Sequence, residues 1–136
     1  MGESSWNGPR RASEGFPRQL RIARRSEFRA LYDGGRRLHS ENFVLFGREN
    51  ALEHHRLGIT VTRKIGGAVV RNRIKRLFRE AFRRSRAEIP GHFDFVVNAR
   101  RDCSRAGFDT LRLEFLSAAR GLSRGDRSVR EAAARP

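Results

Sequence analysis

Cationic side chains crowd one segment of this 136-residue sequence, and their chemistry is that of phosphate binding. Residues 63–86 hold ten Lys or Arg and a single acid, Glu80. Guanidinium and ammonium groups donate hydrogen bonds to phosphate oxygens and neutralise their charge. An ordinary solvent-facing surface intersperses acidic residues with basic ones. The segment therefore points to a polyanionic partner rather than to a face that is merely hydrated.

A helical period separates these cations from an apolar stripe. At about 100° per residue, one sector collects Val70, Ile74, Leu77, Phe78, Ala81 and Phe82. The opposite side collects Asn72, Lys75, Arg76, Arg79, Arg83 and Arg86. Like charges four residues apart, such as Arg79 and Arg83, destabilise an isolated helix by a few tenths of a kcal/mol per pair, roughly. Because this arrangement of like charges lowers the stability of the helix, the charged face is better explained by a binding role than by a structural one.

Other chemistries find less support in the residue pattern. The four His residues lack metal-site spacing, and His54 with His55 is interpreted as part of a solvated hairpin loop. No nucleophile elbow or paired-carboxylate cluster supports a protein-based hydrolase. Glu80 is interpreted as local charge balance, and the lone Cys103 as incidental, since it can form neither an internal disulfide nor a multi-cysteine zinc site. The sequence thus favours binding over catalysis by side chains.

Composition agrees with a nucleic-acid partner. The chain carries 30 Lys plus Arg against 15 Asp plus Glu, a formal net charge of +15, and its pI is near 11.7. Such self-repulsion is relieved when a polyanion neutralises the domain. There is no apolar run of roughly 18 residues and no apolar N-terminal stretch, so we expect no membrane association. With a single cysteine, these features predict a cytoplasmic protein.

The elements that must position the cations follow from hydrophobic periodicity. Residues 1–20 and 123–136 are predicted to be flexible tails around one domain at 21–122. A first helix is expected from an N-cap at Ser26 to the Gly34 and Gly35 pair. We expect the remaining elements to be strands at 43–46 and 57–61, a helix at 69–86, a strand at 93–99 and a helix at 108–122.

This element order indicates an α+β fold in which three helices cover a small sheet. The first two strands are predicted to pair as an antiparallel hairpin across the polar stretch from Gly47 to Arg56. The basic helix then follows a breaker at Gly66 and Gly67. Its N-terminal N–H groups suit a phosphate, although a Gly pair alone is a weak signal.

Residues 56–82 resemble the signature of the bacterial ribonuclease P protein component. The core of the resemblance is Arg71, Asn72 and Arg73, followed by Lys75, Arg76, Arg79 and Glu80, and it extends less specifically from Leu20 to Leu122. In that family the protein binds a large catalytic RNA, and the holoenzyme cleaves the 5′ leader from precursor tRNA. The resemblance implies a ribosomal protein S5 domain 2-like fold with a left-handed βαβ crossover through the basic helix. The general rule for such crossovers favours the right-handed form.

By the same resemblance, a group of cationic and polar side chains would bind RNA. Arg and Lys would contact phosphates, and Asn72 would hydrogen-bond a base edge or a 2′-hydroxyl. In the loop before the helix, two further cations are predicted to contact the leader or another phosphate. The full set comprises Arg63, Lys64, Arg71, Asn72, Arg73, Lys75, Arg76 and Arg79.

The resemblance also implies a leader-binding cleft between the first helix and the sheet. The matching positions here are Phe28, Tyr32, Val44 and Phe46. Stacking on rings tolerates any base and is worth about 1–3 kcal/mol per base. Spacing alone favours Phe28 and Phe46 as ordinary core residues, whereas for Tyr32 the two interpretations are balanced.

The function implied is that of the protein subunit of ribonuclease P, an endonuclease of tRNA 5′ maturation. The resemblance implies no protein-bound cofactor, no small-molecule substrate and no catalytic side chain, with Mg²⁺ held by the RNA subunit. The partners would be the ribonuclease P RNA and precursor tRNA. Two alternatives stay open: a ribosomal or RNA-chaperone protein without an enzyme, and a basic helix reading a DNA major groove. The second lacks a helix-turn-helix partner signal.

Overall fold

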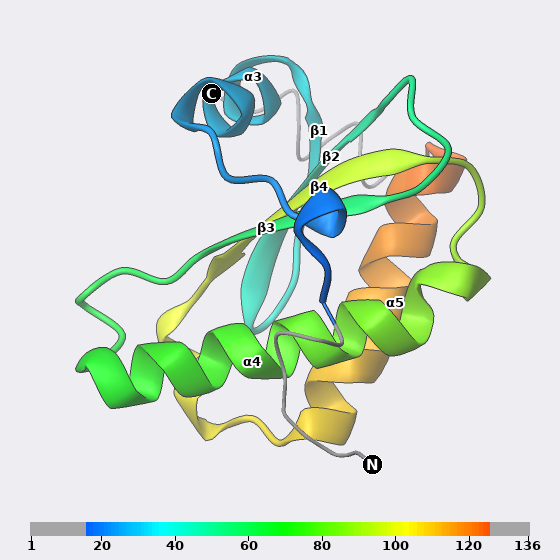
Figure 1. Ribbon diagram of the computed structural model, residues 1–136. Coiled ribbons are helices and arrows are strands. Elements are labelled where there is room, and N and C mark those ends of the chain that lie inside the picture. The colour runs from blue at the N-terminus through cyan, green and yellow to red at the C-terminus, as the bar shows by residue number, and fades with distance from the viewer. Residues whose placement is uncertain (1–15, 126–136) are drawn as a thin grey trace, which may run out of the picture.

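A computed structural model describes residues 16–125 of the chain. Three α-helices and four strands alternate with short 3₁₀ turns (Figure 1). The helices are α3 (Arg25–Gly34), α4 (Ala68–Ser85) and α5 (Phe108–Arg124). The strands are β1 (Arg36–His39), β2 (Phe43–Glu49), β3 (Arg56–Thr60) and β4 (Phe93–Ala99). The 3₁₀ turns are η2 (Arg18–Leu20), η3 (Arg86–Glu88) and η4 (Arg101–Arg105). The predicted α+β class is confirmed.

The strands form one sheet in the order β1-β2-β4-β3. Strand β2 is antiparallel to both β1 and β4, whereas β3 is parallel to β4. The predicted hairpin between β2 and β3 is therefore wrong, because β4 lies between them. Parallel neighbours require a long crossover, and α4 supplies it. The five buried residues at the start of β4 are typical of a central strand.

Alternation along the strands divides the core between the two faces of the sheet. On β2, Phe43 and Leu45 join the main core beneath α4 and α5. Val44 and Phe46 point to the other face, where they pack with Val96 of β4 and Leu31 of α3. Figure 1 shows α3 on one side of the sheet and α4 with α5 on the other. A three-layer arrangement results, with α3 as a thin outer layer.

The folded part begins earlier than the sequence predicts. Phe16 and Leu20, assigned to the N-terminal tail, have exposed fractions of 2% and 4% and belong to the main core. The other end of the fold also lies beyond the prediction, because α5 continues to Arg124. Residues 1–15 and 126–136, the rest of the predicted tails, lie outside the described residues.

Smaller differences concern the element ends. Helix α3 starts at Arg25 with Arg24 as N-cap and no side-chain cap, so the predicted N-cap at Ser26 is wrong. Its predicted end at the Gly pair is confirmed, since α3 stops at Gly34. Strand β1 is absent from the prediction, because a short edge strand of basic residues lacks an apolar pattern. The β3–α4–β4 crossover runs through the basic helix as expected, and its hand stays a prediction.

Candidate nucleic-acid interface

Helix α4 buries the predicted stripe and so turns its cations away from the main core. Ile74, Phe78, Ala81 and Phe82 are completely buried. Val70 and Leu77 at the margins are partly buried against the same core. Since six apolar residues on one side fix the rotation of the helix, the charged residues can only lie on its flanks and outer face.

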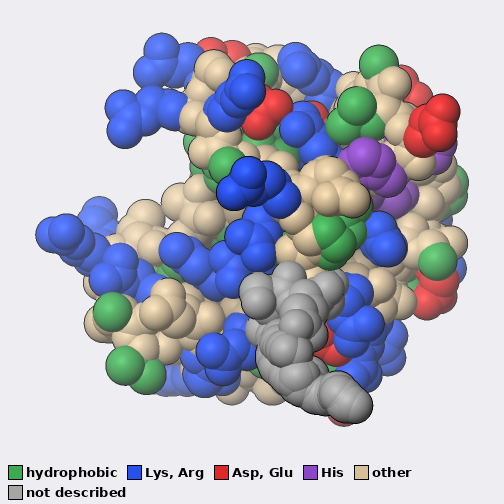
Figure 2. Space-filling view, in the orientation of Figure 1, with side chains coloured by type: hydrophobic (Ala, Val, Ile, Leu, Met, Phe, Trp, Pro, Cys, Tyr) green, Lys and Arg blue, Asp and Glu red, His purple; other side chains and the backbone are tan. Residues whose placement is uncertain are grey.

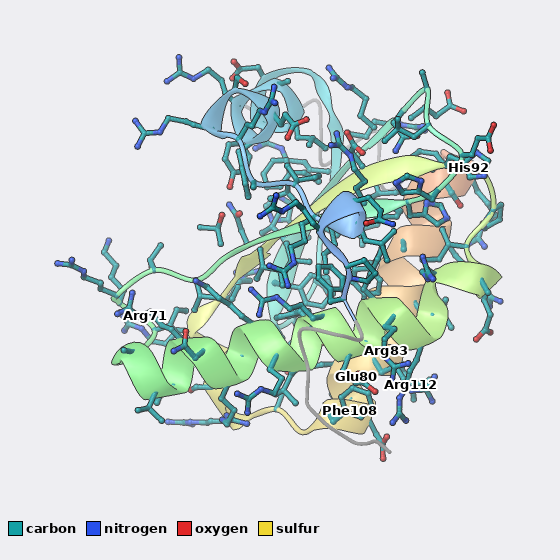
Figure 3. The ribbon with its side chains drawn as sticks, in the orientation of Figure 1. Arg71, Glu80, Arg83, His92, Phe108 and Arg112 are labelled. Carbon is teal, nitrogen blue, oxygen red and sulfur yellow. The ribbon has the colours of Figure 1, made fainter. Side chains whose placement is uncertain are left out.

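The outer cations of α4 differ between its two halves. Near the C-terminal end, Glu80 binds Arg83 at 2.5 Å and Arg84 at 2.7 Å, which confirms its role in local charge balance. The hydrogen bond from Arg83 is the main reason that the pKa of Glu80 is lowered. Figure 3 shows Glu80 and Arg83 near Phe108 of α5. Because this single acid is engaged, the N-terminal half keeps its positive charge unbalanced.

Toward that N-terminal half, the exposed polar and charged side chains of α4 are Asn72, Arg73 and Arg76. Arg73 also donates a hydrogen bond of 2.8 Å to the carbonyl oxygen of Ser104 on η4. The loop from β3 adds Arg63 and Lys64, which are exposed. No described carboxylate forms an ion pair with any of these four cations. This exposed group makes up an outer basic surface.

Three of the predicted contacts lie elsewhere. Arg71, Lys75 and Arg79 are partly buried, and Lys75 and Arg79 line a small pocket together with Arg21 and with Phe28 of α3. Burial, followed by repulsion from Arg21 and Arg76, lowers the pKa of Arg79. The Nε of Arg71 is buried without a hydrogen-bond partner among the described residues. The helical wheel puts Lys75 and Arg79 in solvent, but it cannot show that Phe16, Arg21 and Ile22 pack beside them.

On the opposite face of the sheet, α3 brings the predicted aromatic residues together. The Tyr32 ring lies 6.4 Å from Phe28 and 4.9 Å from Phe46, measured between ring centroids. Phe28 and Tyr32 line an open pocket of about 370 Å³ with Ala23, Arg25 and Thr60, which we call the aromatic pocket. Tyr32 is 37% exposed, whereas Phe46 is only 6% exposed. Phe46 and the partly buried Val44 form the floor beneath the pocket rather than its wall.

Polar contacts fix α3 over this pocket. Tyr32 donates its hydroxyl proton to Oδ1 of Asn98 at 2.9 Å, so the Thr60 hydroxyl, 3.0 Å away, donates to Tyr32. Farther along the sheet, Arg56 binds Glu27 of α3 at 3.1 Å and Asp94 of β4 at 2.7 Å. These contacts join residues up to 66 positions apart, so no local sequence signal could have revealed them.

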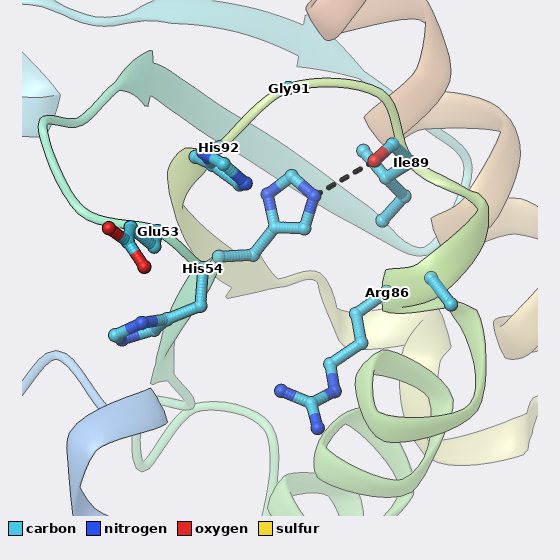
Figure 4. Close-up of a pocket in the computed structure, with 8 residues that line it drawn as sticks. Glu53, His54, Arg86, Ile89, Gly91 and His92 are labelled. Carbon is cyan, nitrogen blue, oxygen red and sulfur yellow. Dashed lines mark hydrogen bonds between the residues drawn. The ribbon is translucent and has the colours of Figure 1, made fainter.

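One histidine of the predicted solvated loop, His55, lies in the interior of the fold. His55 is buried, and the prediction of a solvated loop is wrong for this residue. Its Nδ1 accepts a hydrogen bond of 2.9 Å from the backbone N–H of Phe93, so its Nε2 must carry the proton that faces the Ile89 carbonyl at 3.0 Å. Burial lowers the His55 pKa. His55 lines a pocket together with His54, Arg86 and His92, and the dashed line in Figure 4 marks its hydrogen bond to the Ile89 carbonyl.

Metal binding and nucleophilic chemistry at Cys103 find no support in the part of the chain that the structure describes. Within residues 16–125, no three His, Cys, Asp or Glu side chains are grouped so that they could hold a metal ion. Burial raises the pKa of the Cys103 thiol to about 11, which makes it a poor nucleophile at neutral pH. None of the helices over the same residues has the length and apolar character needed to span a bilayer.

The surface in Figure 2 gathers Lys and Arg side chains around a hollow between α3 and the loop that leads into α4, while acids lie mainly at the top and right. The loop that leads into α4, with its exposed Arg63 and Lys64, lies on one side of this hollow, and α3, whose Phe28 and Tyr32 line the aromatic pocket, lies on the other. Phosphates suit the basic loop, and unstacked bases suit the aromatic pocket. Fold and surface thus define the class: a small α+β domain built to bind nucleic acid.

Comparison with known proteins assigns the family. The sequence model described as Ribonuclease P matches residues 16–122. The chain is 46% identical over 113 residues to a protein of Desulfovibrio desulfuricans named "Ribonuclease P protein component", covering 80% of this chain and 87% of that one. The corresponding protein of Thermotoga maritima is 41% identical over 109 residues, covering 77% and 93%. The chain therefore belongs to the ribonuclease P protein family.

Solved structures agree with this assignment. The ribonuclease P protein from Thermotoga maritima superposes with a TM-score of 0.68 at 39% identity, covering 74% of this chain and 94% of that chain. The Staphylococcus aureus protein gives a TM-score of 0.67 at 31% identity, covering 73% and 91%. Both matches cover nearly three quarters of this chain.

Proposed function

We propose that this chain is the protein subunit of ribonuclease P and promotes removal of the 5′ leader from precursor tRNA. Membership of the family supports an assembly with ribonuclease P RNA. The observation that supports the rest is that α3, which carries the aromatic pocket, and the loop that leads into α4, with its exposed Arg63 and Lys64, lie on either side of one hollow in the surface (Figure 2). A folded RNA and a single strand leaving it can be bound at once by such a pair of surfaces.

In this proposal the outer basic surface binds the RNA subunit. Arg63, Lys64, Arg73 and Arg76 are exposed and have no described carboxylate partner, so phosphates would be their counterions. Asn72, exposed between Arg71 and Arg73, offers a donor and an acceptor for a base edge or a 2′-hydroxyl. Each phosphate contact would release condensed counterions, which makes assembly strongly dependent on salt.

The aromatic pocket would hold the 5′ leader. Tyr32 presents an exposed ring above Phe46, and Phe28 forms the neighbouring wall. Stacking requires only the flat face of a base, so leaders of different sequence can occupy the same pocket. Val44 and Phe46 would act from below by keeping the Tyr32 ring in place.

Catalysis belongs to the RNA subunit in this proposal, with Mg²⁺ bound there and activating the attacking water. The protein contributes by neutralising phosphate repulsion and by positioning the substrate. Its cationic residues support that division, because arginine does not exchange protons at neutral pH and cannot act as a general base. The cytoplasm expected from the sequence is the compartment that we propose for the assembly.

Reconstitution tests the proposal. The full chain is mixed with a bacterial ribonuclease P RNA and a precursor tRNA at low Mg²⁺, where the RNA alone cleaves slowly. We expect the chain to stimulate cleavage at the leader junction and to cut nothing without the RNA. Binding of structured RNA without any stimulation would instead favour the RNA-chaperone alternative, and preference for duplex DNA at equal salt would favour the DNA-binding one.

A further inference from the structure

A small pocket between α3 and α4, which we call the cationic pocket, is lined by three cationic side chains from two separate parts of the chain. Arg21 precedes α3, while Lys75 and Arg79 come from one flank of α4. The pocket measures about 100 Å³, and its apolar walls include Phe28 and Gly58. It is much smaller than the aromatic pocket, which suits a compact anion better than a planar base.

The three cations have no described acid to neutralise them. Within residues 16–125, neither Lys75 nor Arg79 makes an ion pair, because Glu80, the nearest acid along α4, binds Arg83 and Arg84. Repulsion from Arg21 contributes to the lowered pKa of Arg79, second only to burial. Grouping like charges at a partly buried position costs free energy, and an anion among them would remove this cost.

Arg21 is already fixed in position to receive such an anion. Its Nε donates a hydrogen bond of 3.2 Å to the carbonyl oxygen of Phe16. Its guanidinium carbon lies 5.6 Å from the centroid of the Phe16 ring. Its terminal nitrogens donate to no described residue, so their hydrogen bonds can go to a ligand. A preorganised guanidinium loses less conformational entropy on binding than a mobile one.

The pocket continues the aromatic pocket rather than standing apart from it. Phe28 lines both, with Tyr32 and Arg25 on one side and Arg21, Lys75 and Arg79 on the other. A strand whose base stacks in the aromatic pocket would carry its backbone past Phe28 toward α4. Phosphate groups occur at every nucleotide, so one of them would come within reach of the cationic pocket.

We propose that Arg21, Lys75 and Arg79 bind one backbone phosphate of the single-stranded leader beside Phe28. This inference rests on the proposed function, since it names how that strand is held. It divides the cations of α4 into two groups: Arg73 and Arg76 face the RNA subunit, whereas Lys75 and Arg79 face the substrate strand. The helical wheel, by contrast, assigns Lys75, Arg76 and Arg79 to one solvent-facing side.

A neutral-linkage scan tests the pocket. In a series of precursor tRNAs, each leader phosphate in turn is replaced by an uncharged methylphosphonate. Affinity is measured for the holoenzyme and, with leader-length single-stranded RNA, for the full chain alone. We expect one linkage to weaken binding of the wild type by about tenfold or more, as for removal of a hydrogen bond to a charged group. In Arg79→Gln and Lys75→Gln, the same linkage should lose most of its effect.

Controls separate the pocket from folding and from overall charge. Arg101→Gln removes an exposed cation of η4 that does not line the pocket, and its scan should match the wild type. Thermal melting of Arg79→Gln should show no loss of stability, because the change removes a partly buried cation that repels its neighbours. A large loss would indicate a structural role, and Lys75→Gln then carries the test.

The outcomes distinguish the two proposals. If the wild type stimulates cleavage but no leader linkage is sensitive, or if the sensitive linkage is equally sensitive in Arg79→Gln and Lys75→Gln, the pocket assignment is wrong and the proposed function stands. If the wild type fails to stimulate cleavage, the proposed function fails. The scan on the full chain alone then decides whether the pocket binds a single-strand phosphate.

Discussion

The ring of Phe28 lies directly against the backbone of Gly58, at the point where α3 meets the sheet. A Cβ added to Gly58 would come within 2.8 Å of Phe28 Cζ and 3.2 Å of Ile22 Cβ. Phe28 in turn forms the wall shared by the aromatic pocket and the cationic pocket. The absence of one side chain on β3 therefore sets how deeply the helix sits over both.

Gly58→Ala should displace Phe28 and disturb both pockets together. Overpacking of this kind typically costs about 1–3 kcal/mol of stability. We expect a lowered melting temperature and a larger loss of affinity for leader-bearing precursor than for mature tRNA. Gly107→Ala is the matched control, because a Cβ there meets nothing within 4 Å. Wild-type leader affinity in Gly58→Ala would show that the position of Phe28 does not matter.

Tyr32→Ala should weaken the binding of precursor tRNA by about 1–3 kcal/mol, the value of one stacked base. Mature tRNA, which lacks the leader, should bind as before. Tyr32→Phe keeps the ring but removes the hydroxyl that bonds Asn98 and Thr60, so it should retain most of the affinity. Equal losses for precursor and mature tRNA in Tyr32→Ala would contradict the assignment of the aromatic pocket to the leader.

Removal of outer cations should change the salt dependence of RNA binding. For Arg76→Ala and for Arg73→Ala, the slope of log K against log salt should become shallower by roughly 0.7–0.9 for each phosphate that is no longer neutralised. The fold should survive, since both side chains are exposed. Arg73→Ala additionally removes the hydrogen bond to Ser104, so its melting temperature must be measured too. An unchanged slope in both variants would place the RNA elsewhere.

Acid should destabilise the fold through His55. Its folded-state pKa lies below the ordinary 6.5, mainly because the ring is buried, with His92 and Arg86 adding positive charge nearby. The unfolded chain therefore takes up the proton first, and stability is lost as the pH falls through about 6.5 toward the lower folded-state value. The slope for one proton is at most about 1.4 kcal/mol per pH unit.

The same measurement on variants isolates this residue. His55→Gln should be less stable at neutral pH but should lose this part of the pH dependence. His39→Gln changes an exposed histidine of β1 and should follow the wild-type profile. Urea unfolding between pH 7 and pH 5 gives both slopes, and parallel profiles for wild type and His55→Gln would remove His55 as the titrating group.

Asp94→Asn should loosen α3 from the sheet. Burial favours the protonated form of Asp94, but hydrogen bonds from Arg56 and Asn50 outweigh this and lower its pKa. Neutralising the carboxylate leaves Arg56 with Glu27 alone, and we expect a loss of roughly 3 kcal/mol, as for a broken buried pair. Glu88→Gln, which breaks the exposed pair with Arg120, should cost about 1 kcal/mol or less. Similar small losses in both would show that the Arg56 network does not support α3.

The sequence by itself determines the features that depend on local periodicity and on residue chemistry. The apolar stripe from Val70 to Phe82 fixes which side of α4 is buried, and the near-absence of acids in residues 63–86 fixes the sign of its charge. The strand at 93–99 is likewise predicted with its observed bounds, because a run of apolar residues next to Pro90 and Gly91 has few other interpretations.

The tertiary structure alone decides how these parts meet. The insertion of β4 between β2 and β3, the burial of Phe16 and His55, and the grouping of Arg21 with Lys75 and Arg79 all join residues far apart in the chain. A helical wheel records directions around one axis and carries no information about the segment that packs beside it. Whether a cation of α4 faces open solvent or a pocket next to Phe28 therefore depends on packing between elements, which no local pattern encodes.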